Sequence, residues 1–351
     1  MGARSRTKES EFKTVNSFVE EPEVLKPMTV AVLMGGVSSE REVSLASGKN
    51  VAEALRGRGH TVLEVVVNDE TLNALWNAQP DVVFIALHGG FGEDGGMQAL
   101  LESRGLPYTG SGVEASKLAM NKVASKEVFL SAGVPTPDYF GLSRNAPLSS
   151  HMVLAEKLGL PVVVKPVAEG SSVGVTVVRK MDELAVALAK AFPFGGQVVM
   201  ETYIPGREMT VGVLDGQALP IIEIIPKGES YDYHAKYKSD ETLYLLDFDL
   251  DPAVYKAIQA ACVKAHEVLG CKVFSRVDVR LNPANEFYIL EVNTIPGFTS
   301  HSLMPKAAKR AGIEFGELCE RIIEVSLREH AATLRRERAE AAAAAERVVR
   351  V

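Results

Sequence analysis

The apolar positions in the first third of the chain alternate between short runs and helical spacing. Three apolar runs have the length of buried strands: residues 29–34, 61–67 and 81–87. Segments 39–57 and 97–104 instead place apolar residues three and four apart, as in helices with one buried face. Alternating strands and helices indicate a parallel sheet, and such sheets bind ligands at the carboxyl ends of their strands. We therefore expect an N-terminal α/β domain over residues 28–121 that contributes to substrate binding.

The pattern changes after residue 121. An initial helix is followed by three short apolar strands, which predicts a small antiparallel sheet backed by helices. Further on, strands are expected at 208–214, 218–225, 273–281 and 286–293. The expected units are a central subdomain, a C-terminal domain and a charged, alanine-rich helical tail: residues 122–206, 207–328 and 329–351. Residues 1–27 are polar and without periodicity, which is typical of a flexible leader.

Composition narrows the class of partner. Of the 351 residues, 46% are apolar and 24% are charged, as expected for a globular protein. The formal charge of −7 provides no basic surface for nucleic acid, and no apolar stretch is long enough to span a membrane. The first residues lack the apolar segment of a secretory signal. Three cysteines without CxxC spacing are expected to be buried thiols, so we predict a reducing, cytoplasmic location.

The strongest chemical signal lies on two predicted strands near residue 280. Arg276 and Asp278 are two apart on one strand, and Glu291 and Asn293 are two apart on the next. Alternate residues of a strand point to one face, so the four side chains converge if the strands pair. Clustered hard oxygen ligands suit Mg²⁺ that bridges nucleotide phosphates, and the arginine suits a phosphoryl group or an oxyanion. The alternative is an exposed sheet face of mixed charge.

A Gly/Ser loop follows a strand that ends in a lysine. Lys165 precedes the run Glu169-Gly170-Ser171-Ser172-Val173-Gly174. Such a loop exposes backbone N–H groups that bind phosphate oxygens, and the lysine supplies a cation. A simple hairpin loop is an equally good explanation of this segment alone. The chain has no Walker motif and no GxGxxG after its first strand, so a phosphate loop of another class is required.

Two polar residues flank the carboxyl ends of the first strands. His88 follows the strand 81–87 and precedes a glycine-rich run at 89–96, which indicates close backbone approach to a partner. A structural histidine is the alternative. Glu40 lies within 39–42, a predicted capping box at a helix start. Its carboxylate complements the helix dipole or binds a substrate ammonium group, and the residues alone do not separate these roles.

The polar segment 228–242 carries three tyrosines and two lysines. It is longer than a plain connection, which favours a lid over the site. The alternative is a flexible surface loop.

With these segments in view, the chain resembles the D-alanine–D-alanine ligases over residues 28–327. The similarity rests on long motifs that occur in the family's order: Gly35-Gly36-Val37-Ser38-Ser39-Glu40-Arg41-Glu42-Val43-Ser44, Leu87-His88-Gly89, Gly92-Glu93-Asp94-Gly95, Pro107-Tyr108-Thr109-Gly110-Ser111-Gly112, Lys165-Pro166, Tyr231-Asp232-Tyr233, Ala235-Lys236-Tyr237 and Glu291-Val292-Asn293-Thr294.

The resemblance implies an α/β architecture of the ATP-grasp fold with an N-terminal parallel-sheet domain, and nucleotide held between the central and C-terminal domains. It implies that ATP phosphorylates the carboxylate of a first D-alanine and that the amine of a second D-alanine attacks the acylphosphate. It also implies two Mg²⁺ (or Mn²⁺) ions, a role in peptidoglycan precursor synthesis and a homodimer.

Residue roles follow from the same resemblance, position by position. For ATP it implies Lys122, Lys165, Ser171, Glu201, the backbone of Ile204, Glu208 and Lys236, and for the metal ions Asp278, Glu291 and Asn293. For the two D-alanines it implies Glu40, His88, Arg276, Ser302 and Leu303. Catalysis is expected to depend on Glu40, Ser171, Tyr237, Arg276 and the N–H of Gly297.

Two alternative functions remain at this stage. One is an ATP-grasp ligase with D-serine or D-lactate as second substrate, although Tyr237 resembles the D-alanine-specific members. Thr202 departs from members that carry lysine beside adenine, but only its backbone is expected to matter. The other alternative is a non-catalytic nucleotide-binding module, which the presence of Arg276, Asp278 and Glu291 disfavours.

Overall fold

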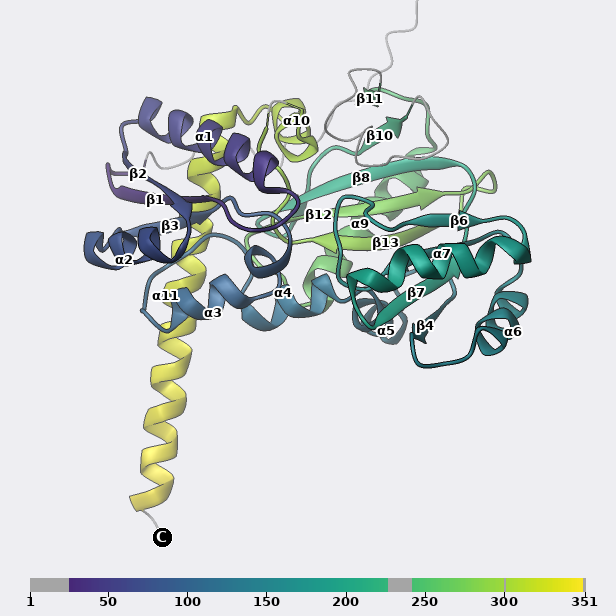
Figure 1. The fold of residues 1–351 in the computed structure, drawn as a ribbon. Coiled ribbons are helices and arrows are strands. Elements are labelled where there is room, and N and C mark those ends of the chain that lie inside the picture. The colour runs from purple at the N-terminus through teal and green to yellow at the C-terminus, as the bar shows by residue number, and fades with distance from the viewer. Residues whose placement is uncertain (1–24, 227–241, 300, 350–351) are drawn as a thin grey trace, which may run out of the picture.

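The computed structural model describes residues 25–226, 242–299 and 301–349. Its N-terminal part contains the predicted parallel sheet, which is confirmed with the strand order β2-β1-β3 (Figure 1). The strands are β1 (Thr29–Gly35), β2 (Thr61–Val67) and β3 (Val82–Ile85), accompanied by helices α1 (Arg41–Gly57), α2 (Asp69–Ala78) and α3 (Gly96–Glu102). Because β1 lies between two strands and under helices, its residues are buried on both faces, which explains its continuous apolar run.

The start of α1 differs from the predicted capping box. The helix begins at Arg41 with Glu40 as its N-cap residue, and no side chain caps it. Instead, Ser38 accepts two hydrogen bonds: its backbone carbonyl accepts from the N–H of Arg41, and the Ser38 hydroxyl accepts from the N–H of Glu40. The helix therefore begins one residue later than a Ser39 cap requires, and the Glu40 carboxylate accepts a hydrogen bond from Ser171.

The central part forms a separate antiparallel sheet with the order β4-β7-β5-β6. Its strands are β4 (Tyr139–Ser143), β5 (Val162–Pro166), β6 (Thr176–Val178) and β7 (Gln197–Thr202). Helices α6 (Leu148–Leu158) and α7 (Leu184–Ala191) pack on it and close a core of its own. Helices α4 (Val113–Met120) and α5 (Lys122–Ser131) connect this unit to the N-terminal sheet. The small antiparallel sheet is as predicted, with β4 and α6 as additions.

The C-terminal sheet has the order β11-β10-β8-β12-β13, and β9 pairs with β8 beside it. The strands are β8 (Arg207–Leu214), β9 (Gln217–Ala218), β10 (Ile222–Ile225), β11 (Leu243–Leu245), β12 (Phe274–Leu281) and β13 (Phe287–Asn293), and α9 (Pro252–Val268) packs against them. The continuous strand predicted at 218–225 is wrong. Pro220 lies between β9 and β10, and a proline provides no N–H for a sheet ladder.

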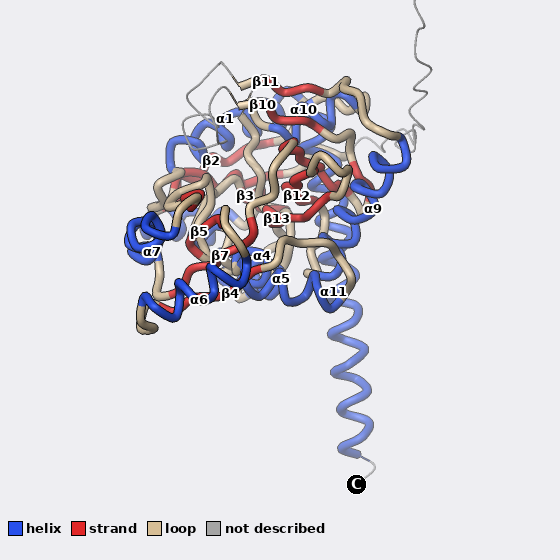
Figure 2. Tube along the Cα trace, turned by 90° about the vertical axis from the view of Figure 1, so that its right-hand side faces the viewer, coloured by secondary structure: helices blue, strands red, loops and turns tan. Residues whose placement is uncertain are grey.

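The N-terminal and C-terminal sheets share one hydrophobic core. It includes Val32 and Phe84 from the first sheet, and Leu214 and Phe274 from the last. Helices α10 (Leu303–Arg310) and α11 (Phe315–Val349) add residues to the same core. Figure 2 shows that the central sheet lies to one side of this body.

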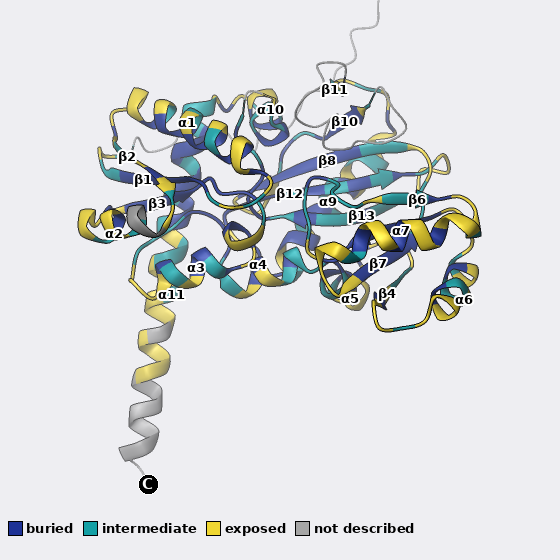
Figure 3. Ribbon diagram, in the orientation of Figure 1, coloured by how far each residue is buried: buried dark blue, intermediate teal, exposed yellow. Residues whose placement is uncertain are grey.

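The later turns of α11 extend away from the body as one continuous helix (Figure 1). Its first turns bury apolar residues at helical spacing, whereas residues 331–336 and 338–341 are mostly exposed (Figure 3). Within the described segments, no helix combines the length and the apolar character needed to cross a bilayer. The three cysteines are unpaired and buried, as predicted.

Candidate active site

The two polar strand segments pair as the alternation predicted. Strands β12 and β13 are antiparallel, with Asp278 opposite Glu291 and Arg276 opposite Asn293. Arg276 donates from Nε and Nη2 to the two carboxylate oxygens of Asp278, each at 2.9 Å. Thr210 on the neighbouring strand donates to Asp278 Oδ1 at 2.7 Å. The four predicted side chains therefore share one face of the sheet, and the arginine and Asp278 orient each other.

A cleft of about 220 Å³ lies between the central and C-terminal sheets. It brings together seven of the predicted nucleotide and metal residues: Lys122, Lys165, Glu201, Ile204, Glu208, Asp278 and Glu291. Apolar side chains of Val163, Val177 and Leu290 also line it, so it offers both an apolar surface for a flat ring and charges for phosphates. Lys236 and Tyr237, and the lid predicted at 228–242 except for its last residue, lie outside the described residues.

Glu201 is the centre of a buried charge cluster. Lys165 contacts its Oε1 at 2.6 Å, and Lys126 contacts its Oε2 at 2.8 Å. Burial works against the charge of Glu201, but the two lysines outweigh it and lower the pKa of this carboxyl. Burial also opposes the charge of Lys165, yet the facing carboxylates of Glu201 and Glu291 raise its pKa. Both groups are therefore charged in the folded protein.

Lys126 is a residue that the sequence did not suggest. Its side chain is fully buried, and it donates to the hydroxyl of Thr136 at 2.7 Å. Burial, only partly offset by Glu201, lowers the pKa of Lys126 to about 8. The sequence feature that could have identified it is its position four residues after Lys122 on α5, because this spacing puts both lysines on the same helix face. One helix thus contributes two cations around the cleft.

The donor sets fit a nucleotide and a divalent metal. Glu201 Oε2 is buried against Lys126 Nζ at 2.8 Å, and because a carboxylate oxygen has two lone pairs, it can also accept from an adenine amino group. Lys122 Nζ lies 3.2 Å from Glu291 Oε2 and donates to the carbonyl of Glu169 at 2.7 Å. In the described part of the chain no three His, Cys, Asp or Glu side chains form a metal cluster. A cation here would use two carboxylates, the Asn293 amide and phosphate oxygens.

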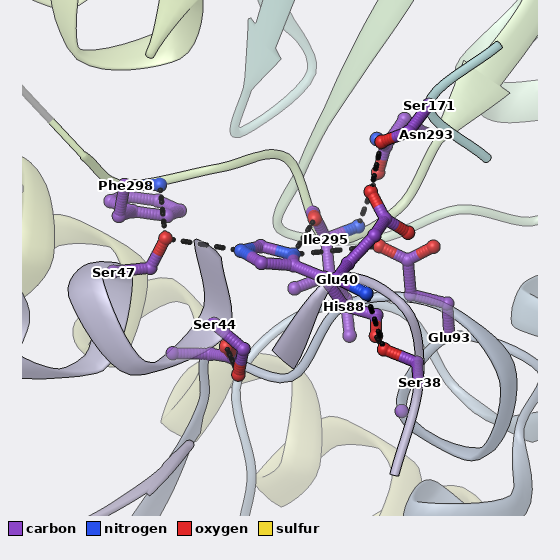
Figure 4. Close-up of polar contacts among 12 residues, drawn as sticks. Ser38, Glu40, Ser44, Ser47, His88, Glu93, Ser171, Asn293, Ile295 and Phe298 are labelled. Carbon is purple, nitrogen blue, oxygen red and sulfur yellow. Dashed lines mark hydrogen bonds and ion pairs between the residues drawn. The ribbon is translucent and has the colours of Figure 1, made fainter. Parts of the chain in front are cut away.

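A second group of predicted residues gathers beside the cleft, where the Gly/Ser loop meets the start of α1 (Figure 4). Ser171 donates to Glu40 Oε1, and both side chains are buried. Ser171 and Ser172 have φ angles of 49° and 59°, in the left-handed region that non-glycine residues rarely adopt. A side chain at Gly89 would bring its Cβ to 2.9 Å from Glu40 Oε2. Backbone therefore closes around this carboxylate from two loops.

His88 is buried and uses both ring nitrogens within the protein. Nε2 lies 3.1 Å from the hydroxyl of Ser47, and Nδ1 lies 3.1 Å from the carbonyl of Ile295 (Figure 4). Glu93 Oε1 lies 3.7 Å from Nδ1. Burial raises the pKa of Glu93, against the opposing influence of His88. His88 therefore connects the N-terminal domain to the segment after β13.

The remaining predicted residues follow that segment. A Cβ at Gly297 would lie 2.7 Å from the hydroxyl oxygen of Ser302, so the two residues are adjacent. The Ser302 hydroxyl accepts from the N–H of Thr299 at 2.8 Å, and Leu303 begins α10 as a buried residue. In the C-terminal part, Arg276 thus lies on β12, Gly297 follows β13, and Ser302 precedes α10.

Family comparisons agree with this arrangement. A model described as "D-ala D-ala ligase C-terminus" matches residues 128–324, and one described as "D-ala D-ala ligase N-terminus" matches residues 69–111. The D-alanine–D-alanine ligase of Citrifermentans bemidjiense is 48% identical over 304 residues, which cover 87% of this chain and 98% of that protein. That of Actinobacillus pleuropneumoniae serotype 5b is 46% identical over 305 residues, covering 86% and 99%.

Solved structures give the same result. A D-alanine–D-alanine ligase from Bacillus anthracis, complexed with ATP, is 35% identical and aligns with a TM-score of 0.78 over 87% of this chain and 99% of its own. The ligase from Coxiella burnetii aligns with the same TM-score at 27% identity. These neighbours have the ATP-grasp fold, which confirms the predicted fold class. The chain therefore belongs to the D-alanine–D-alanine ligase family.

Proposed function

We propose that this chain ligates two D-alanine molecules to D-alanyl-D-alanine at the expense of ATP, which yields ADP and phosphate and supplies a peptidoglycan precursor. The observation that carries the proposal is the paired polar face of β12 and β13, with Asp278 opposite Glu291, which lines the same cleft as Lys165. Carboxylates, a guanidinium and buried lysines around one cleft suit phosphoryl transfer to a carboxylate.

The reaction balances in two steps. A carboxylate oxygen of the first D-alanine bonds to the γ-phosphorus as the bond to ADP breaks. The amine of the second D-alanine then attacks the acyl carbon, loses a proton, and phosphate leaves from the tetrahedral intermediate. We assign the oxyanion of that intermediate to Arg276 and the N–H of Gly297, since positioned donors at a developing negative charge lower the barrier.

Substrate contacts are proposed on both sides of the cleft. Glu40, which Ser171 orients, would bind the ammonium group of the first D-alanine beside His88. Ser302 and the N–H of Leu303 would bind the carboxylate of the second. Lys122 and Lys165 would contact the phosphates, and Glu201, Ile204 and Glu208 the adenosine.

We also propose that Asp278, Glu291 and Asn293 hold two Mg²⁺ or Mn²⁺ ions. When bound, these ions would neutralise phosphate charge and orient the transferred group. The N–H of Ile295 donates to Asn293 Oδ1 at 2.9 Å, and this orients the amide toward its proposed role.

Three broader features belong to the same proposal. The unit boundaries are those expected from the sequence, 28–121, 122–206 and 207–328, and Lys236 would contact the transferred phosphoryl group. The protein acts as a cytoplasmic homodimer.

The test is phosphate release from ATP and Mg²⁺ with D-alanine or L-alanine, followed by mass analysis of the product. D-alanine should support turnover and give the dipeptide mass, whereas L-alanine should not. Equal turnover of the two enantiomers contradicts the stereochemical assignment. A product containing D-serine or D-lactate, when these compete with D-alanine, identifies a different second substrate. Nucleotide binding without turnover on any of them supports a non-catalytic module.

A further inference from the structure

We propose that Ser47 is a positioning residue of the ligation reaction, and that it acts with His88 to hold residues 295–298 in their catalytic conformation. This inference rests on the proposed function, because the segment 295–298, here called the oxyanion loop, carries Gly297. Neither ring nitrogen of His88 nor the hydroxyl of Ser47 needs to touch substrate in this role.

With a neutral His88 ring, the hydrogen bonds form a relay that runs in one direction. The N–H of Phe298 can only donate, so the Ser47 oxygen accepts from it at 3.1 Å. The carbonyl of Ile295 can only accept, so His88 carries its proton on Nδ1, 3.1 Å away. The remaining proton of Ser47 therefore points to His88 Nε2, also at 3.1 Å. The relay starts at one end of the oxyanion loop and finishes at the other (Figure 4).

Both ends of the oxyanion loop are shielded from water. Ser47 and Phe298 have no exposed surface, and His88 is 5% exposed. From residue 294 to residue 298, Gly297 is the only residue that is not buried. Water therefore cannot replace a lost bond of the relay at low cost. The protein fixes the neighbours of Gly297 and leaves its own backbone accessible.

Helix α1 also holds Phe298 by a second route. Asn50, one turn after Ser47, donates from Nδ2 to the carbonyl of Phe298 at 3.2 Å. The Phe298 ring packs edge-on against Phe84 and Phe274, at centroid distances of 5.6 and 5.8 Å. Both backbone polar groups of this residue are thus bonded to one helix.

The same helix begins at Glu40, the proposed ligand of the first D-alanine's ammonium group. Helix α1 therefore determines the separation between that ammonium and the oxyanion donor at Gly297. A displacement of about 1 Å at a reacting group lowers a rate by roughly 100-fold, so this separation matters for catalysis rather than for binding.

Ser44 offers a matched control on the same helix. Its hydroxyl accepts from the N–H of Gly35 at 2.8 Å and donates to the carbonyl of Ala86 at 2.7 Å. Like Ser47, it has no exposed surface. Its partners are the last residue of β1 and the residue after β3, and neither belongs to the oxyanion loop. Ser44→Ala therefore removes two buried hydrogen bonds without releasing Gly297.

The experiment compares the steady-state kinetics of wild type, Ser44→Ala, Ser47→Ala and Asn50→Ala, with ATP varied at saturating D-alanine. Ser47→Ala should lower kcat by about 10- to 100-fold while changing the KM for ATP by less than about threefold, because removing support for one oxyanion donor affects the transition state. Ser44→Ala should lose about as much thermal stability as Ser47→Ala, but its kcat should stay within about threefold of wild type. Asn50→Ala should lower kcat by about 3- to 10-fold, and it tests the proposal even if Ser47→Ala does not fold.

Inhibition by a tetrahedral phosphinate mimic of the intermediate adds a second measurement. Its inhibition constant should rise in Ser47→Ala by about the same factor as kcat falls, since such mimics bind through transition-state contacts. Equal kcat losses in Ser44→Ala and Ser47→Ala, or an unchanged inhibition constant, overturn the proposal. A wild-type protein that forms no D-alanyl-D-alanine instead overturns the proposed function, and the two failures are therefore distinct.

Discussion

Ser171 donates a hydrogen bond to the carboxylate of Glu40 across 131 residues of sequence. Ser171 belongs to the Gly/Ser loop of the central sheet, and Glu40 to the start of α1 in the N-terminal domain. The bond therefore joins the phosphate-loop candidate directly to the proposed ammonium site. Phosphate binding and substrate binding share this contact.

Ser171→Ala should reduce kcat/KM for D-alanine. A hydrogen bond to a charged group contributes about 1.5–3 kcal/mol, which corresponds to roughly a 10- to 100-fold loss. This loss of kcat/KM can be measured by steady-state kinetics with D-alanine as the varied substrate. Ser150→Ala, an exposed serine of the same unit, is the control and should leave kcat/KM unchanged. A Ser171→Ala protein with wild-type kinetics shows that Glu40 does not depend on this bond.

Glu291→Gln should weaken metal binding with little change of shape. Because one carboxylate charge is lost opposite Asp278, the Mg²⁺ concentration for half-maximal turnover should rise by at least about tenfold. Glu286→Gln on the same hairpin is exposed and should behave like wild type. Asn293→Ala should abolish most of the activity, and EDTA should abolish all of it. An unchanged Mg²⁺ dependence in Glu291→Gln contradicts the metal assignment.

Lys126→Met should raise the KM for ATP by about tenfold, because Lys126 and Lys165 together outweigh the charge of Glu201 and leave one net positive charge toward the phosphates. Lys190→Met, at an exposed lysine of α7, is the control. A KM for ATP in Lys126→Met equal to that of the control removes Lys126 from nucleotide binding.

The low pKa of Lys126 also predicts a pH dependence. Since burial lowers this pKa to about 8, the lysine loses its proton as the pH rises through about 8, and the KM for ATP should then increase in wild type. The variant should lack this increase. Between about pH 8 and the unfolded value near 10.4, the unfolded chain binds more protons, so this group's contribution to the free energy of unfolding rises with pH. Measurement of KM across this range in both proteins tests the assignment.

The parts of the site that local geometry determines were predictable from the sequence. Strand alternation places Arg276 and Asp278 on one face of the sheet, independent of the rest of the fold. Pairing of β12 with β13 adds Glu291 and Asn293 to the same face. Lys126 and Ser47 were not predictable in this way. A lysine or serine inside a helix has the pattern of an ordinary helical residue, and only contacts with β7 or with the oxyanion loop reveal its role.

Local patterns missed two features of the fold. The capping box at 39–42 is absent because the helix begins at Arg41, one residue later than a Ser39 cap requires. Strand β4 was not expected because Gly141 lies in its middle, and glycine is depleted in strands. Its pairing with β7 is a long-range contact that no local pattern indicates.

The shared core of the two outer sheets has a consequence for how the molecule opens. Because the N-terminal and C-terminal parts bury one another's apolar residues while the central sheet has its own core, the protein consists of two cooperative units. Amide protons of β4–β7 should therefore exchange together, at a lower opening free energy than those of β1 and β12. A substrate that contacts both Glu40 and Ser171 bridges the two units. Its apparent affinity then depends on the fraction of free protein in which the two units are already in contact. A mutation remote from the cleft that changes this fraction should therefore change the affinity without altering any contact to the ligand.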